Sequence, residues 1–250
     1  MKLTLQIDYK KAFDTAYLSF LKECGYEGVE LLLNGNLTDI EKAKKNIEEA
    51  GLTVPQTEIV KDNIEEGLKA SAFFGVKWAC FQGEMNYDTN LIVKSLPLAE
   101  KYGVGIALEN PARYSNYIDA FCIWVDSFKS EWVGVCYNPG HTNIIGNDDF
   151  GLKKFDFDRI EALKKVGDRI KIAHMNDNNG DVDRRLAPTV PSTPCCIKWK
   201  ETLDAFKEVG FDGAFSLVLA IDFGKYDLEK DYLKFSANVS NILLGKEVAR

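Results

Sequence analysis

Short apolar runs and helical patterns alternate along the whole chain. Eight runs in which apolar residues are continuous or alternate with polar ones are typical of strands: 2–8, 28–34, 52–58, 77–82, 104–109, 133–137, 169–174 and 213–221. Apolar positions recur at helical spacing in eight further segments: 12–24, 38–50, 62–74, 89–102, 115–128, 157–166, 198–209 and 228–244. Thr38-Asp39-Ile40-Glu41 predicts a capping box at the start of the second helix.

The strict alternation of strands and helices predicts parallel strands joined by right-handed crossovers. Eight such units in 250 residues fit a closed (β/α)8 barrel, the TIM barrel architecture, as a single domain over residues 1–250. The alternative is an open doubly wound sheet. No glycine-rich phosphate loop follows the first strand, so we favour the barrel.

The barrel also predicts where function resides, because active sites of such barrels lie at the carboxyl ends of the strands. Most residues at those ends are polar: Asp8, Glu30 or Asn34, Glu58, Gln82, Glu109, Asn138 with His141, His174, and Val218 or Asp222. The two histidines of the chain both follow apolar runs at this end, which predicts a shared site.

Glu109 and His174 are the main candidates for chemistry. Glu109 closes the apolar run 105–108, where partial burial suits a base or a metal ligand, although a salt bridge to Arg113 is an alternative. His174 can ligate a metal or shuttle a proton, or it can bond only to neighbouring backbone.

Weaker candidates surround these two. Asn138 offers a hard cation only an amide oxygen, so we expect it to orient a substrate hydroxyl or a turn. His141 follows a Pro-Gly pair and either caps that turn or contacts the substrate. Asp183 and Arg185 lie in a long polar loop, 177–194, and can bind a phosphate or carboxylate, although such charge runs are commonly solvated surface.

Composition narrows the function classes. Hydrophobic residues make up 46% and charged residues 28% of the chain, as in ordinary soluble proteins. A net charge of -7 argues against a nucleic-acid-binding surface. No apolar run approaches the roughly 20 residues of a membrane span, and no signal-peptide pattern is present, so we expect a cytoplasmic protein. The six cysteines lack CxxC spacing, which favours buried free thiols; only Cys195 and Cys196 fall in a loop.

Six short motifs follow one another in a characteristic order: 25–31, 51–57, 102–104 with 108–110, 137–141, 174–178 and 210–213. In this order they resemble the xylose isomerase-like barrels, a superfamily that includes sugar phosphate isomerases and epimerases, ketose 3-epimerases and endonuclease IV of AP endonuclease family 2. The resemblance covers nearly the whole chain and does not identify a substrate.

The resemblance implies a metal site that this chain has altered. In epimerase-like members, a glutamate, an aspartate, a histidine and a second glutamate on the last four strands bind a divalent metal, and the two glutamates move a proton next to a carbonyl. Glu109 and His174 match the first glutamate and the histidine. Asn138 stands at the aspartate and Val218 at the second glutamate. We therefore expect a divalent metal (Mn, Zn or Mg) to be weakly bound or absent, with Glu109 as the only remaining base.

Other members of the superfamily have further zinc ligands. They carry histidines where this chain has Glu58 and Gln82, and an Asp-x-His where it has Asp183 and Arg185 separated by one residue. Endonuclease activity needs that full cluster and is not expected here. We expect these four residues and His141 to bind substrate instead.

Two functions remain open from the sequence. The first is a sugar or sugar-phosphate isomerase or epimerase, in which the charge of Arg185 stands in for the metal by pairing with Glu109 or Glu58. The second is a non-catalytic barrel that binds a sugar or polyol. Both imply a small carbohydrate or sugar phosphate as partner, and neither a nucleic acid nor a membrane. A homo-oligomeric state is also compatible with the sequence, because the barrels that this chain resembles often form dimers.

Overall fold

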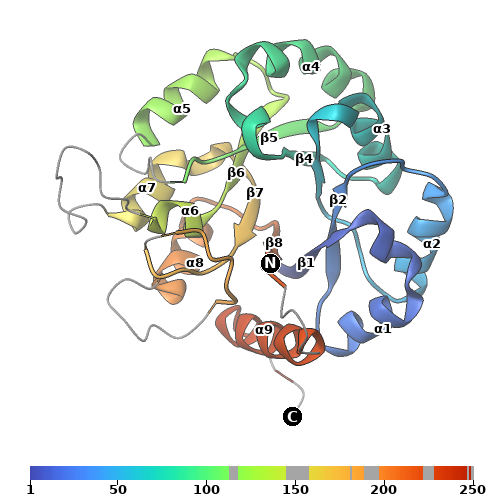
Figure 1. Ribbon diagram of the computed structural model, residues 1–250. Coiled ribbons are helices and arrows are strands. Elements are labelled where there is room, and N and C mark those ends of the chain that lie inside the picture. The colour runs from blue at the N-terminus through green and yellow to red at the C-terminus, as the bar shows by residue number, and fades with distance from the viewer. Residues whose placement is uncertain are drawn as a thin grey trace.

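The predicted barrel is confirmed by the computed structural model, which describes residues 1–112, 118–144, 158–180, 182–188, 197–221, 228–246 and 248, without the side chains of Glu84 and Asn86. Eight parallel strands form a closed ring in chain order, and β8 pairs with β1 (Figure 1). The strands are β1 Lys2–Asp8, β2 Gly28–Leu33, β3 Thr57–Ile59, β4 Trp78–Phe81, β5 Gly105–Glu109, β6 Val133–Tyr137, β7 Ile170–Met175 and β8 Ala214–Leu217.

Helices surround this ring (Figure 1). The α-helices in the described residues are α1 Thr15–Glu23, α2 Ile40–Glu49, α3 Ile64–Phe74, α4 Thr89–Tyr102, α5 Ile118–Ser127, α6 Pro139–Asn143, α7 Arg159–Val166, α8 Trp199–Glu208 and α9 Glu229–Leu243. Short 3-10 helices are η1 Tyr9–Phe13, η2 Lys61–Asn63, η3 Gly83–Tyr87 and η5 Gly167–Arg169.

Several predicted boundaries are wrong. Of the third predicted strand, 52–58, only the last two residues belong to β3; Thr53 forms a single bridge to Gly28, and Pro55 between them has no N–H to donate to a ladder. The predicted capping box does not form, because the N-cap Asp39 has a left-handed backbone (φ 53°) and makes no side-chain cap bond. The predicted eighth strand, 213–221, is likewise shortened to β8.

Side chains of each strand alternate between two environments. On β1, Leu3, Leu5 and Ile7 belong to the large apolar core that also contains helix residues, so they face the helices. The intervening Gln6 faces the barrel interior. A second, small apolar cluster inside the barrel consists of Cys80, Ala107, Cys136 and Ile172, with Trp78 packed against it. The rest of the described interior is largely polar, which places the chemistry of this protein inside the barrel.

Trp78 occupies space in the lower barrel that two glycines leave open. A Cβ atom at Gly105 would clash with the Trp78 ring, and one at Gly134 would lie 3.1 Å from it. The indole therefore fills the interior between neighbouring strands. A separate cavity of about 600 Å³ lies below it, lined by residues such as Gln56 and Lys171.

Other sequence expectations are only partly tested. The four cysteines in the described residues, Cys24, Cys80, Cys122 and Cys136, are buried free thiols, as predicted. Cys195 and Cys196, Arg113 and Asp222 lie outside the described residues. Among the helices that the structure describes, none has the length and apolar character needed to cross a membrane.

We predict that Gly105→Ala lowers the free energy of unfolding by about 1–3 kcal/mol, because the new methyl group meets the Trp78 ring. Urea denaturation of Gly105→Ala, of Trp78→Leu and of the double variant Gly105→Ala/Trp78→Leu measures the energetic coupling between the two positions. The cost of the glycine substitution should shrink when the indole is absent. Equal costs in both backgrounds would contradict this role of Trp78.

Candidate active site

A cavity of about 1170 Å³ opens at the carboxyl ends of the strands. Seven of the eight residues expected at the site line it: Glu58, Gln82, Glu109, Asn138, His141, His174 and Arg185. The eighth, Asp183, contacts both His141 and Arg185. Asp8 and Asn34 do not take part in the described lining; Asp8 caps η1 and accepts a hydrogen bond from Asn34. Most of the predicted strand-end residues therefore do converge.

One wall of the cavity is apolar. Tyr87 and Trp124 lie with their ring centroids 6.3 Å apart, and the ring of Phe121 lies 6.0 Å from that of Trp124. Met85, Pro111 and Ala112 also line the cavity. The cavity thus combines an aromatic wall with a charged floor.

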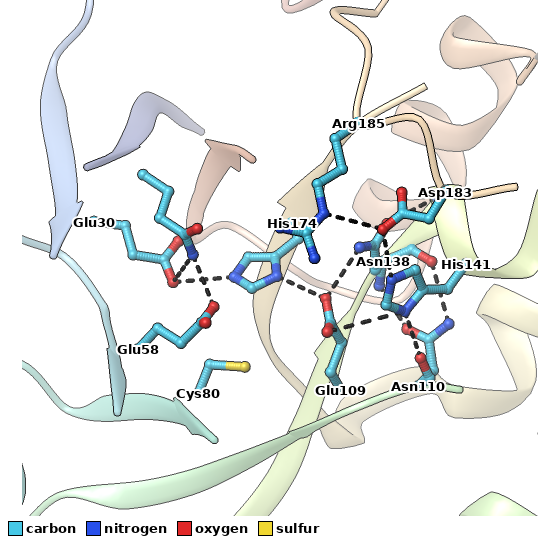
Figure 2. A network of polar contacts seen from close by, with 12 residues as sticks. Glu30, Glu58, Cys80, Glu109, Asn110, Asn138, His141, His174, Asp183 and Arg185 are labelled. Carbon is cyan, nitrogen blue, oxygen red and sulfur yellow. Dashed lines mark hydrogen bonds and ion pairs between the residues drawn. The ribbon is translucent and has the colours of Figure 1, made fainter. Parts of the chain in front are cut away.

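Glu109 is held in place by three polar side chains. Its Oε1 accepts hydrogen bonds from Asn138 Nδ2 (3.0 Å) and from His174 Nδ1 (2.8 Å), and its Oε2 lies 3.9 Å from His141 Nδ1 (Figure 2). Burial opposes ionisation, but the charge of His141 and the contacts with His174 and Asn138 outweigh it and hold the pKa of Glu109 well below its usual range. Glu109 is therefore an ionised carboxylate of fixed orientation.

His174 joins two strands across the barrel interior. Its second nitrogen, Nε2, lies 3.0 Å from Glu30 Oε1, so both ring nitrogens face carboxylates (Figure 2). Burial lowers the pKa of His174, but the charge of Glu30 and the hydrogen bonds to Glu109 and Glu30 raise it well above its usual value. In this arrangement the imidazole carries a proton on each nitrogen. The sequence alternative, a histidine bonded only to backbone, is wrong.

Glu30 was named from the sequence only as one option for a strand end. It lies within β2, is fully buried, and accepts a hydrogen bond from Gln56 Nε2 (2.9 Å) in addition to its contact with His174. The charge of His174 outweighs burial and lowers the pKa of Glu30. A signal was available in the sequence, since Glu30 is a carboxylate inside the apolar run 29–33.

Glu58 lies deeper than expected for a substrate-binding residue. Only 7% of it is exposed, and its Oε2 accepts a hydrogen bond from Gln6 Nε2 (2.8 Å). Burial raises its pKa to about 7, although the charge of His174 acts in the opposite direction and those of Glu30 and Glu109 add to the rise. Gln6, which the sequence reading missed, is the inward residue of β1 at this level and also lines the cavity.

Asn138 orients both a turn and a carboxylate. It is the N-cap of the short helix α6: its Oδ1 accepts from Gly140 N (2.8 Å), while its Nδ2 donates to Glu109. His141, in the same turn, contacts the carbonyl oxygen of Asn110 (Nδ1 to O, 2.8 Å) and Asp183 Oδ2 (3.6 Å). The turn-orienting role expected for Asn138 is confirmed.

Arg185 makes a different principal contact from the one hypothesised. Its Nε donates to Asp183 Oδ2 at 3.1 Å. Burial lowers the pKa of Arg185, but the hydrogen bond and charge of Asp183 outweigh it, and the charges of Glu109 and Glu58 add smaller contributions in the same direction. The side chain is 52% exposed and lines the cavity, so it remains accessible to a ligand.

Asn176 is a site residue that the sequence reading missed. It follows β7, is fully buried, and lines the cavity, yet neither atom of its amide has a hydrogen-bond partner. Gly140 allows this placement, because a Cβ there would collide with the Asn176 amide oxygen. A buried amide without partners costs roughly 1–3 kcal/mol, which a bound hydroxyl or water can recover.

The residues at the family's metal position do not fit a divalent cation. Val218 is 7% exposed and lines the cavity, but it has no donor atom. The amide oxygen of Asn138 is bonded to Gly140, and its NH2 group faces Glu109. Two groups of described residues nevertheless bring potential ligand atoms within 4.8 Å of one another: Glu30, Glu58 and His174, and Cys80, Cys136 and His174.

Comparison with known proteins relates the chain to one family. A family model described as xylose isomerase-like TIM barrel matches residues 91–223. The uncharacterized protein MJ1311 of Methanocaldococcus jannaschii is 27% identical over 215 residues, which cover 80% of this chain and 67% of that protein.

Two solved structures share the fold at low identity. The 3-keto-D-glucoside 4-epimerase YcjR of E. coli has a TM-score of 0.66 and 16% identity, over 94% of this chain and 98% of that one. The xylose isomerase domain protein of Planctomyces limnophilus has a TM-score of 0.70 and 12% identity, over 98% of this chain and 96% of that one.

We predict that Asn138→Asp destabilises the protein by about 1–3 kcal/mol at neutral pH. The new side chain can still cap Gly140 N, but a carboxylate would replace the NH2 group that donates to Glu109. Thermal and urea unfolding in the presence of a chelator measure the effect. Asn138→Ala, which removes the cap and the donor without adding charge, separates the two losses. Wild-type stability of Asn138→Asp would contradict the donor role.

Proposed function

Because the chain belongs to the xylose isomerase-like TIM barrel family, we propose that it is a sugar or sugar-phosphate isomerase or epimerase that moves a proton next to a carbonyl group. The observation that carries the proposal is Glu109, an ionised carboxylate fixed at the floor of the cavity by Asn138 and His174. A fold neighbour, YcjR, is described as a sugar epimerase, which supports the substrate class.

Glu109 has the properties required of a proton acceptor. Its carboxylate remains ionised at any physiological pH, because its pKa is held well below the usual value. Its contacts fix its orientation, so a bound substrate can place a C–H bond next to one oxygen. The same contacts make Glu109 a weaker base than a free glutamate.

Other residues support binding of a polyol. The unpartnered amide of Asn176 can donate to one hydroxyl and accept from another. Arg185 can bind a phosphate or carboxylate, and Gln82 is an exposed amide that also lines the cavity. The ring faces of Tyr87 and Trp124 offer an apolar surface to the C–H face of a sugar. We propose that Glu58, His141 and Asp183 act by positioning these groups.

No step in this proposal passes through a metal at the family's position, because Asn138 and Val218 do not supply its ligands. Val218 also cannot return a proton to the opposite face of a substrate. These two residues favour the alternative function, a barrel that binds a sugar or polyol without turnover. A cytoplasmic location and a homo-oligomeric state remain expectations from the sequence.

We predict that wild-type protein exchanges a substrate proton with deuterium from solvent, and that Glu109→Gln reduces this rate by about 100- to 10,000-fold. Proton NMR in D2O, with a panel of ketoses and ketose phosphates, measures the exchange. Glu100→Gln, an exposed carboxylate on α4, is the matched control. Binding without exchange would support the non-catalytic alternative, and a panel in which no member binds would contradict both functions.

We also predict that Asn176→Ala weakens binding of the best ligand by about 10-fold or more, because no protein group competes with the ligand for its buried amide. Calorimetric titration measures the affinity. The variant should fold at least as stably as wild type, since no protein hydrogen bond is lost. An unchanged affinity would remove Asn176 from the binding site.

A further inference from the structure

Glu30, Glu58 and His174 converge from β2, β3 and β7 at the base of the cavity, which Glu58 and His174 line. Their ligand atoms lie within 4.8 Å of one another, and His174 Nε2 is 3.0 Å from Glu30 Oε1. Two ligands of a tetrahedral cation, each at roughly 2.1 Å, stand about 3.4 Å apart. A cation can therefore replace the proton between His174 and Glu30 after a movement of a few tenths of an ångström.

Each of the three side chains is already held by an outer partner. Gln56 Nε2 donates to Glu30 Oε2, and Gln6 Nε2 donates to Glu58 Oε2. His174 Nδ1 donates to Glu109, which directs Nε2 toward the two deeper carboxylates (Figure 2). Histidine ligands in metalloproteins are typically oriented in this way, by a carboxylate on the other ring nitrogen.

Ser216 gives an independent indication of a missing ligand. It stands opposite His174 in the register of β7 and β8 and is fully buried. Its hydroxyl lies close enough to Glu30 to help lower the pKa of that carboxyl, but it makes no hydrogen bond of normal geometry. A metal-bound water beside Glu30 would give this hydroxyl a partner.

The charges around His174 also favour a cation. Glu30 and Glu109 both contact the imidazole of His174, and the ligand atom of Glu58 lies within 4.8 Å of those of Glu30 and His174, so a cation bound here is surrounded by acidic groups. The amides of Gln6 and Gln56 are neutral, so they orient the two glutamates without contributing charge.

We propose that this barrel binds one divalent transition-metal ion, such as manganese or zinc, through Glu30, Glu58 and His174, a ligand set that keeps the family's histidine and uses Glu30 and Glu58 in place of positions 138 and 218. Imidazole and carboxylate ligands suit these ions. Glu58 and His174 also line the cavity, so the remaining coordination position faces it. The inference concerns binding alone, and it can hold or fail independently of the proposed proton transfer.

The thiols of Cys80 and Cys136 form the competing ligand set with His174. Both are fully buried; a hydrogen bond between the thiols and burial raise the pKa of Cys80, and burial raises that of Cys136 to about 12. Using them would add two negative charges to a region that already holds three carboxylates. The oxygen ligands of Glu30 and Glu58 are therefore favoured.

Metal binding by the full chain tests the site. Protein stripped with a chelator is loaded with Mn²⁺ or Zn²⁺ and desalted, and its metal is counted by elemental mass spectrometry, with affinities from calorimetry. We expect one ion per chain. Glu30→Gln and Glu58→Gln should each weaken binding by at least about 10-fold, whereas Cys136→Ala should leave it unchanged.

Three results would overturn the proposal. Wild-type protein could retain no metal after loading. Asn138→Ala could abolish binding while Glu30→Gln does not, which would return the ion to the family's position. Cys136→Ala could abolish it, which would assign the thiols.

A measurement on wild-type protein covers the case in which the glutamine variants do not fold. X-ray absorption of the zinc-loaded chain should show only nitrogen and oxygen neighbours, including one imidazole. A sulfur neighbour would reject the carboxylate set.

Discussion

The interior of this barrel depends on the pair of contacts that the imidazole of His174 makes with two carboxylates. The imidazole lies between a carboxylate of β2, Glu30, and one of β5, Glu109, and both of its nitrogens are engaged. Removing it would leave Glu30 buried without its positive partner, a situation that typically costs 3–5 kcal/mol, and would leave Glu109 with only His141 near its charge. His174 therefore stabilises the fold and also sets the charge and orientation of the proposed base.

Closure of the ring explains why these groups meet. Residues 30, 109 and 174 are far apart in sequence, but inward positions of parallel strands point at a common axis when the sheet closes. Trp78 fills the lower interior beside Gly105 and Gly134, so the polar groups gather in the upper part. The cavity above them then joins a charged floor to an aromatic wall.

The departures from the family pattern redistribute acidic groups. At the ends of β6 and β8, where the family's metal would lie, this chain has Asn138 and Val218 instead of residues with carboxylates. Glu30 and Glu58 supply buried carboxyl groups on β2 and β3, and Glu58 also lines the cavity. Asn138 has also become a donor to Glu109, which a carboxylate could not be. The site is thus organised around hydrogen bonds to Glu109 rather than around ligands of one ion at that position.

The sequence by itself determined the barrel, the end at which the site lies and the roles of Glu109, Asn138 and His174 as site-facing groups, because strand periodicity and strand ends are local properties. It could not determine the length of β3 or the cap of α2, which depend on pairing and on backbone angles. Only the tertiary structure decided that Glu30 and Gln6 reach the site, that Asn176 has no protein partner and that Arg185 pairs mainly with Asp183. These facts follow from the register of a closed sheet, which sets neighbours that no local pattern encodes.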